Sequence, residues 1–277
     1  MQPNLLLLHI STYFKETMAI ESRVFVLDNS VNNFKQSIKE RPNEHSFAEG
    51  MLMDSISTFR DLSQKGGGDN LYHTGFRYML NYSNLEREIE NTLSSLYLLS
   101  LSQAYEVFET YLIDIFTELL LLFPMHIVTT NLFSESFIIP REILRNQIKQ
   151  KIGREKNNKG YLIALRKLSQ HYKDNESDNI YNCKMGLWFD ILSEVRHDSI
   201  HNRQIISNNF FELLKNHEQE LYFNKYFDKR NTALETVIHL TKDKFHINLN
   251  LLNDFAVFIF KSLSLDNSLN PKYAVVL

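Results

Sequence analysis

The chain has 277 residues, of which 43% are hydrophobic and 23% are charged, a globular composition with enough apolar residues for a sizeable core. Its formal net charge of −3 gives no global attraction to nucleic acid or to acidic membranes, so any basic site must be local. Cys183 is the single cysteine, which excludes a disulfide framework and a thiolate zinc cluster.

The spacing of apolar residues is mostly helical, and glycine (8 residues) and proline (5 residues) are scarce. We therefore predict a predominantly all-α fold. An N-terminal helical region of unknown role is expected over residues 1–84, with one of its helices within 50–64. A helical domain is expected over residues 85–277. The glycine-rich stretch "KGGGDN" at 65–70 predicts a flexible loop before that domain.

The strongest predicted helix covers residues 85–123, where apolar residues recur at three- and four-residue steps until Pro124 ends the pattern. Further helices are predicted at about 140–152, 161–172, 184–203 and 250–263. Before the last of these, the chain becomes rich in aromatic and β-branched residues. This change predicts a small β-hairpin with strands at 220–227 and 235–241, joined by "DKRN".

The most apolar run, residues 111–123, contains Asp114 and Glu118 and is far shorter than the ~20 residues that a membrane span needs. The N-terminal stretch "LLLLHI" has no positively charged leader, so it does not resemble a signal peptide. We therefore expect no membrane association and a cytoplasmic location.

The helix predicted at 184–203 has two faces at roughly 100° per residue. Its core face is predicted to contain Trp188, Ile191, Leu192 and Val195. Nearly opposite lies a polar stripe of Asp190, Glu194, His197 and His201. Arg196 falls between the two faces, and Glu106 or Glu109 of the long helix is available to pair with it or to orient a histidine. An ordinary solvated face is the alternative interpretation of the stripe.

Histidine and arginine together suit the cleavage of RNA. The 2′-hydroxyl is an internal nucleophile next to the phosphorus, so the reaction needs a base for its proton and an acid for the leaving 5′-oxygen. Histidine performs either role near neutral pH. Arginine supplies a permanent, forked donor for the charge that builds on the phosphate oxygens. The two residue types therefore suffice without a metal ion or a cofactor.

The hexapeptide "RHDSIH" (196–201) matches the R-x4-6-H signature of the HEPN superfamily, and "SLSQAYEVFETYLIDIF" (100–116) resembles the long early helix of many members. The resemblance covers about residues 85–265. It implies a metal-independent endoribonuclease that acts as a homodimer, often as a toxin or in antiviral abortive infection. It also implies that Arg196 stabilises the scissile phosphate, that His201 is the principal acid–base residue, and that His197 assists it.

Some members of that superfamily have a tyrosine two residues after the histidine, which a partner antitoxin modifies. Arg203 stands there in this chain, so control by that route is doubtful, although an antitoxin or another defence-system partner is still expected. Arg203 is predicted to contact a flanking phosphate instead. Arg141, Arg145 and Lys149 share one face of a basic helix and are predicted to contact RNA, with a merely solvated face as the alternative.

Two other functions remain open at this stage. The same fold is able to bind RNA or a nucleotide, or to act as a scaffold, without turnover. The other alternative is a metal-dependent hydrolase with the acidic–histidine stripe as ligands. The chain has no HExxH motif, however, and no obvious third ligand elsewhere.

Overall fold

The computed structural model describes residues 4–40, 51–59, 72–130, 140–152, 159–232 and 234–272. These residues form ten helices and four short strands, which confirms the predominantly all-α fold. The helices are α1 (Leu6–Glu40), α2 (Leu85–Leu122), α3 (Met125–Thr130), α4 (Arg141–Lys151), α5 (Lys159–Leu168), α6 (Gln170–Asn175), α7 (Met185–His201), α8 (Asn208–Leu214), α9 (His217–Tyr226) and α10 (Lys242–Asp266). The strands are β1 (Met51–Phe59), β2 (Tyr72–Asn81), β3 (Asp228–Asn231) and β4 (Thr236–His239).

The chain divides into two compact units. The larger consists of Met1–Val24 together with Ser94–Leu277, and the smaller of Phe25–Leu93. The boundary therefore crosses α1 and α2 and does not coincide with the division expected at residues 84 and 85. The glycine-rich loop predicted at 65–70 lies outside the described residues.

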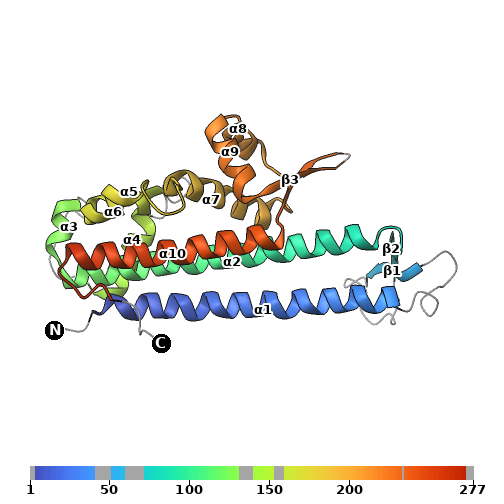
Figure 1. The fold of residues 1–277 in the computed structure, drawn as a ribbon, viewed down its shortest axis with the longest axis horizontal. Coiled ribbons are helices and arrows are strands. Elements are labelled where there is room, and N and C mark those ends of the chain that lie inside the picture. Colours follow the sequence, from blue (N-terminus) through green and yellow to red (C-terminus); the bar gives the residue numbers. More distant parts are fainter. Residues whose placement is uncertain are drawn as a thin grey trace, which may run out of the picture. The chain divides into compact units, whose positions relative to one another are not determined.

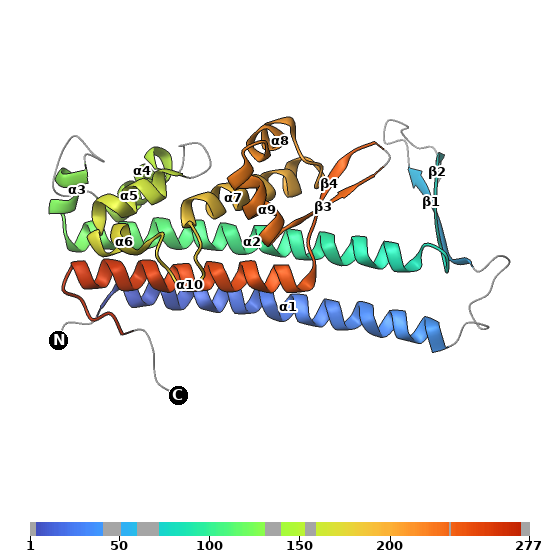
Figure 2. The same cartoon turned by 45° about the horizontal axis from the view of Figure 1, so that its top comes forward.

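The framework of the larger unit is a set of three long helical segments that lie side by side (Figures 1 and 2). They are residues 6–24 of α1, residues 94–122 of α2, and α10. Aromatic rings join them: Phe108 stacks on Phe255 at 5.6 Å between centroids, and the rings of Tyr13 and Tyr111 are 5.3 Å apart. Burial of such large apolar rings supplies much of the hydrophobic stabilisation of this unit.

The helix α7 packs on this framework through the core face that the sequence predicts. Trp188, Ile191, Leu192 and Val195 are all buried. The indole Nε1 of Trp188 donates a hydrogen bond of 3.0 Å to Asn248 Oδ1 on α10. The Asn248 amide nitrogen in turn donates to the carbonyl oxygens of Tyr226 and Lys244. This buried amide therefore links α7, α9 and α10.

The small hairpin before α10 is present, but its predicted first strand is wrong. Residues 217–226 form α9, because Asn216 caps its first turn by accepting from the backbone N–H groups of Glu218 and Gln219. Phe223 and Tyr226, which are three residues apart, are buried on one face of that helix. The "DKRN" segment, expected as the turn, is itself β3 and pairs with β4 from Asp228↔His239 to Asn231↔Thr236.

The smaller unit contains an antiparallel pair of strands, β1 and β2, where the sequence predicts a helix within 50–64. That prediction is wrong because the β-branched Ile56 and Thr58 suit a strand, and the partner strand lies farther along the chain. In this unit, Ile38 of α1 packs with Leu85 and Ile89 of α2 in a small apolar cluster. Within the described ranges, every helix is too short or too polar to cross a membrane.

Candidate functional site

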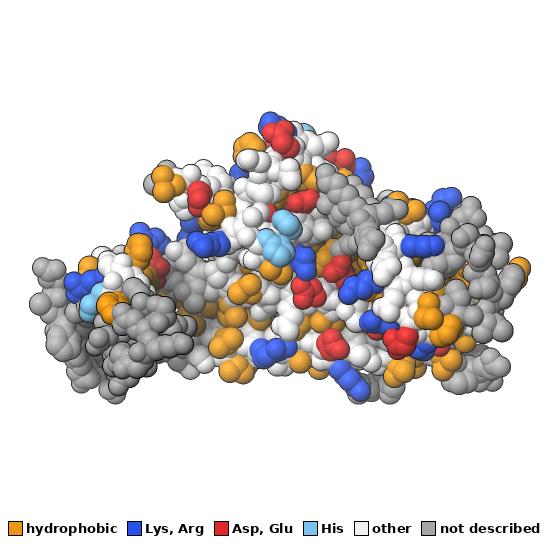
Figure 3. Space-filling view, turned by 180° about the vertical axis from the view of Figure 1, so that it is seen from behind, with side chains coloured by type: hydrophobic (Ala, Val, Ile, Leu, Met, Phe, Trp, Pro, Cys, Tyr) orange, Lys and Arg blue, Asp and Glu red, His pale blue; other side chains and the backbone are white. Residues whose placement is uncertain are grey.

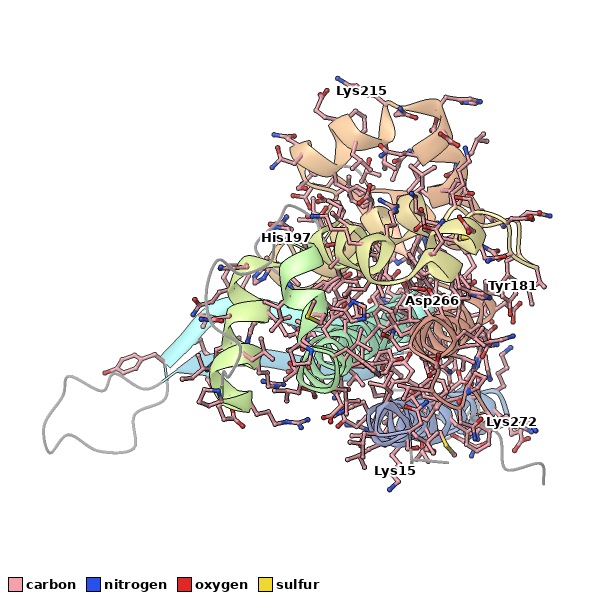
Figure 4. All side chains as sticks on the ribbon, turned by 90° about the vertical axis from the view of Figure 1, so that its left-hand side faces the viewer. Lys15, Tyr181, His197, Lys215, Asp266 and Lys272 are labelled. Atoms are coloured by element: carbon pink, nitrogen blue, oxygen red, sulfur yellow. The ribbon has the colours of Figure 1, made fainter. Side chains whose placement is uncertain are left out.

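The exposed side of α7 presents two histidines at its C-terminal end. The imidazole rings of His197 and His201 have centroids 5.0 Å apart, and both side chains are exposed. Figure 4 looks along the long helices and shows His197 outside them. The face drawn in Figure 3 shows a compact histidine patch with basic and acidic side chains beside it. The two predicted acid–base residues are therefore close to each other and accessible to a ligand.

Arg196 lies at the margin between this exposed side and the core. Its Nη2 donates a hydrogen bond of 2.8 Å to Glu106 Oε1 on α2, so one of the two acidic residues suggested for it is its partner. The Arg196 side chain is 30% exposed, and that of Glu106 is 50% exposed. The Nε atom of Arg196 is buried and makes no hydrogen bond. A single carboxylate oxygen thus holds the guanidinium, and the pair is open to solvent.

Asp198, the third residue of the hexapeptide, has a structural role that sequence reasoning did not identify. It is fully buried. Its carboxylate accepts a 2.6 Å hydrogen bond from the Asn202 side chain and a 2.8 Å hydrogen bond from the backbone N–H of Ser207. Its position three residues after the buried Val195 is the sequence signal that places it toward the core. Asp198 therefore fixes the loop that follows His201.

The same loop is held from its other side by β4. The backbone N–H of Ile206 donates to the Thr236 carbonyl, and the N–H of Ile238 donates to the Gln204 carbonyl. Arg203 and Gln204 adopt left-handed backbone conformations, with φ of 54° and 70°. Arg203 is exposed. Residues 201–203 and 205–208 line a shallow groove of about 490 Å³, so His201 and Arg203 share one surface.

Two of the three basic residues predicted on α4, Arg141 and Arg145, form ion pairs with α2. Their carboxylate partners differ from Glu106, the partner of Arg196. Arg141 Nη1 lies 2.7 Å from Glu118 Oε2, and Arg145 Nε lies 2.6 Å from Asp114 Oδ1. The hydrogen bond to Asp114 raises the pKa of the Arg145 guanidinium. Lys149 is exposed, one turn farther along α4. Both arginines therefore also fasten α4 to α2, a role that the sequence did not indicate.

The predicted polar stripe does not reach the start of α7. Asp190 is 3% exposed and faces the interior beside Leu162 and Arg166 of α5, so its placement on the outward stripe is wrong. The buried arc of α7 is wider there because α5 also packs against this helix. Throughout the described segments, no group of three or more His, Cys, Asp or Glu side chains is placed to hold a metal ion.

Comparisons of the chain with protein-family models, with curated proteins and with solved structures found no match. The function is therefore inferred from the residues, from their geometry, and from the resemblance of "RHDSIH" to the R-x4-6-H signature.

Proposed function

We propose that the protein is a metal-independent endoribonuclease of the HEPN type that acts as a homodimer, as a toxin or as an effector of antiviral defence. The observation that supports this proposal most strongly is the exposed pair of His197 and His201 beside Arg196. Two imidazoles and a guanidinium at one helix end are the groups that transesterification of RNA requires.

In the proposed reaction, an imidazole accepts the proton of the 2′-hydroxyl as its oxygen attacks the phosphorus. A second imidazole donates a proton to the 5′-oxygen as its bond to phosphorus breaks. Arg196 stabilises the charge on the non-bridging oxygens, and Arg203 binds the next phosphate. The products are a 2′,3′-cyclic phosphate and a 5′-hydroxyl.

The homodimer is proposed because the reaction needs acid and base on opposite sides of the phosphate. His197 and His201 are one turn apart on the same side of one helix, with ring centroids 5.0 Å apart. The His201 of a second copy, approaching across the exposed end of α7, would supply the opposite side. The linkage to be cleaved would then lie between the two copies.

The second candidate function is RNA or nucleotide binding without turnover. The partly exposed Arg141 and Arg145 on α4 favour it, because they can bind a phosphate backbone without contact to either histidine. Binding would use the same arginines without bringing a histidine into line with the leaving oxygen.

Incubation of the purified protein with single-stranded RNA in EDTA tests the proposal. We expect wild-type protein to cleave, and His201→Ala and Arg196→Ala to lose on the order of 10²-fold or more in rate. His217→Ala, which removes an exposed histidine from α9, is the matched control and should cleave normally. Equal rates for wild type and His201→Ala would contradict the proposal, and binding without cleavage would favour the second function. Cleavage only in the absence of EDTA would indicate a metal-dependent hydrolase.

A further inference from the structure

Three carboxylates of α2 each hold one arginine from another helix. Each contact is short, between 2.6 and 2.8 Å, and each uses a single arginine nitrogen. The pairs are Glu106 with Arg196 of α7, Asp114 with Arg145 of α4, and Glu118 with Arg141 of α4. The two helices that contribute these arginines, α4 and α7, both lie along α2 (Figure 2).

The three carboxylates occupy one ridge of α2. Positions 106, 114 and 118 belong to a single series of four-residue steps, and the exposed Thr110 fills the remaining step. At 1.5 Å of rise per residue, the first two carboxylates are about 12 Å apart along the axis and the last two about 6 Å apart. Each four-residue step also turns by about 40°, so Glu106 and Glu118 point about 120° apart around the axis. The arginines that they hold therefore form a slanting row with an axial length of roughly 18 Å that ends at Arg196.

Each arginine of the row retains donors for a second ligand. A guanidinium has five N–H groups, and these carboxylates occupy only one nitrogen of each. Arg145 is anchored through Nε, so among the described residues both of its terminal nitrogens are left for another partner. The side chains of Arg141 and Arg145 are 48% and 34% exposed. The carboxylates therefore fix the guanidiniums in place without using their full binding capacity.

We infer that this arginine row binds the phosphate backbone of single-stranded RNA and leads it to Arg196 and His201. The inference rests on the proposed function, because only an extended polyanion that reaches the histidines would use the whole row. With one phosphate per 3.4 Å of a stacked strand, the row spans about five nucleotides. Arg203 continues the path on the far side of His201, in the groove of the following loop.

The dependence of binding on salt tests this inference. The probe is a fluorescent single-stranded oligoribonucleotide, bound in EDTA by protein with the His201→Ala substitution so that the RNA stays intact. The logarithm of the affinity falls with the logarithm of the salt concentration by about 0.7 for each phosphate contact on a single strand. Arg141→Gln and Arg145→Gln should therefore each make this slope shallower by about 0.7.

A charge-neutral pair of variants separates phosphate contact from net charge and from folding. The double variant Asp114→Asn/Arg145→Gln neutralises both members of one ion pair of the row. The control, Glu176→Gln/Arg166→Gln, neutralises both members of the ion pair between α5 and the loop after α6. Arg166 is a suitable control because its side chain is 38% exposed, close to the exposure of Arg145. Circular dichroism checks that both proteins are folded. Only the first variant should reduce the slope.

The inference is overturned if the slope is unchanged in Arg141→Gln and Arg145→Gln, or if the control at Arg166 changes it equally. If either result is found while wild-type protein cleaves RNA, the proposed nuclease activity stands and only the role of the arginine row in binding is rejected. If the row variants make the salt dependence of binding shallower but wild-type protein does not cleave RNA, the arginine row stands as a binding surface and the nuclease activity is rejected.

Discussion

The imidazole rings of His197 and His201 have centroids 5.0 Å apart on the exposed side of α7, one turn from each other at the end of the helix. In the proposed site one phosphate contacts both rings, so their contributions to cleavage should not be independent. We expect His197→Ala to lower kcat less than His201→Ala does. The double variant should be no slower than His201→Ala alone, as is found for residues that act as a unit. Single-turnover rates on one oligoribonucleotide measure this, and fully additive losses would indicate separate roles.

Replacing Asp198 should destabilise the protein and disturb the proposed site together. Its buried carboxylate is the acceptor for the Ser207 backbone N–H, which is only partly buried, so the loss of this acceptor costs toward the lower end of about 1–3 kcal/mol. We expect Asp198→Ala to lower the free energy of unfolding in urea by about 2 kcal/mol, since the partly buried Asn202 side chain also loses its acceptor. Asp178→Ala, at an exposed loop position, should change it little. Equal values for the two variants would contradict the role assigned to Asp198.

Asn248 is expected to be one of the most sensitive core positions. Asn248→Leu keeps the branched shape of the side chain but adds volume, and it leaves the Trp188 indole N–H and the Tyr226 carbonyl without their hydrogen bonds. We expect a loss of about 3 kcal/mol in the free energy of unfolding and a change in tryptophan fluorescence. Asn250→Leu, on the exposed side of the same helix, is the matched control. A loss no larger than that of the control would show that the buried amide is dispensable.

Stability should fall at alkaline pH because of buried tyrosines. Burial raises the pKa of Tyr13 and Tyr111 well above the ordinary tyrosine value, and the carboxylate of Asp254 adds to the effect on Tyr13. The folded state therefore keeps both phenols protonated where the unfolded chain ionises. Their contribution is complete below a pH of about 10 and is lost as pH rises further, with a slope of up to about 1.4 kcal/mol per pH unit for each group.

Urea unfolding across this pH range, with phenolate absorbance recorded in parallel, measures that decline. Tyr111→Phe should flatten the alkaline part of the profile, because it removes one of the two groups. A profile with the same steepness in the variant and in the wild type would contradict the assignment.

The sequence predicts α2 well because its apolar residues recur over many turns, but it gives only the second part of α10 and does not single out α1. The core face of α7 and the end of α2 just before Pro124 are also as predicted. The predicted first strand at 220–227 failed because its aromatic residues suit a strand by propensity alone. Tertiary packing of Phe223 and the cap at Asn216 make the segment helical instead.

The candidate site is only partly visible in the sequence. The hexapeptide gives the identity of Arg196, His197 and His201 and the exposure of the two histidines. It does not give the burial of Asp190, because that depends on where α5 packs. Nor does it give the row of ion pairs, because the partners of Arg141 and Arg145 lie more than 20 residues away on another helix.

We propose that the end of α7 cleaves RNA through attack by the 2′-hydroxyl, without a metal ion. The most direct measurement compares one oligoribonucleotide with its all-2′-deoxy counterpart, in EDTA, and determines the product ends by mass spectrometry. We expect cleavage of the ribonucleotide alone, with 2′,3′-cyclic phosphate and 5′-hydroxyl ends, and loss of that cleavage in His201→Ala. Cleavage of the deoxy strand, or the same products at the same rate from His201→Ala, would contradict it.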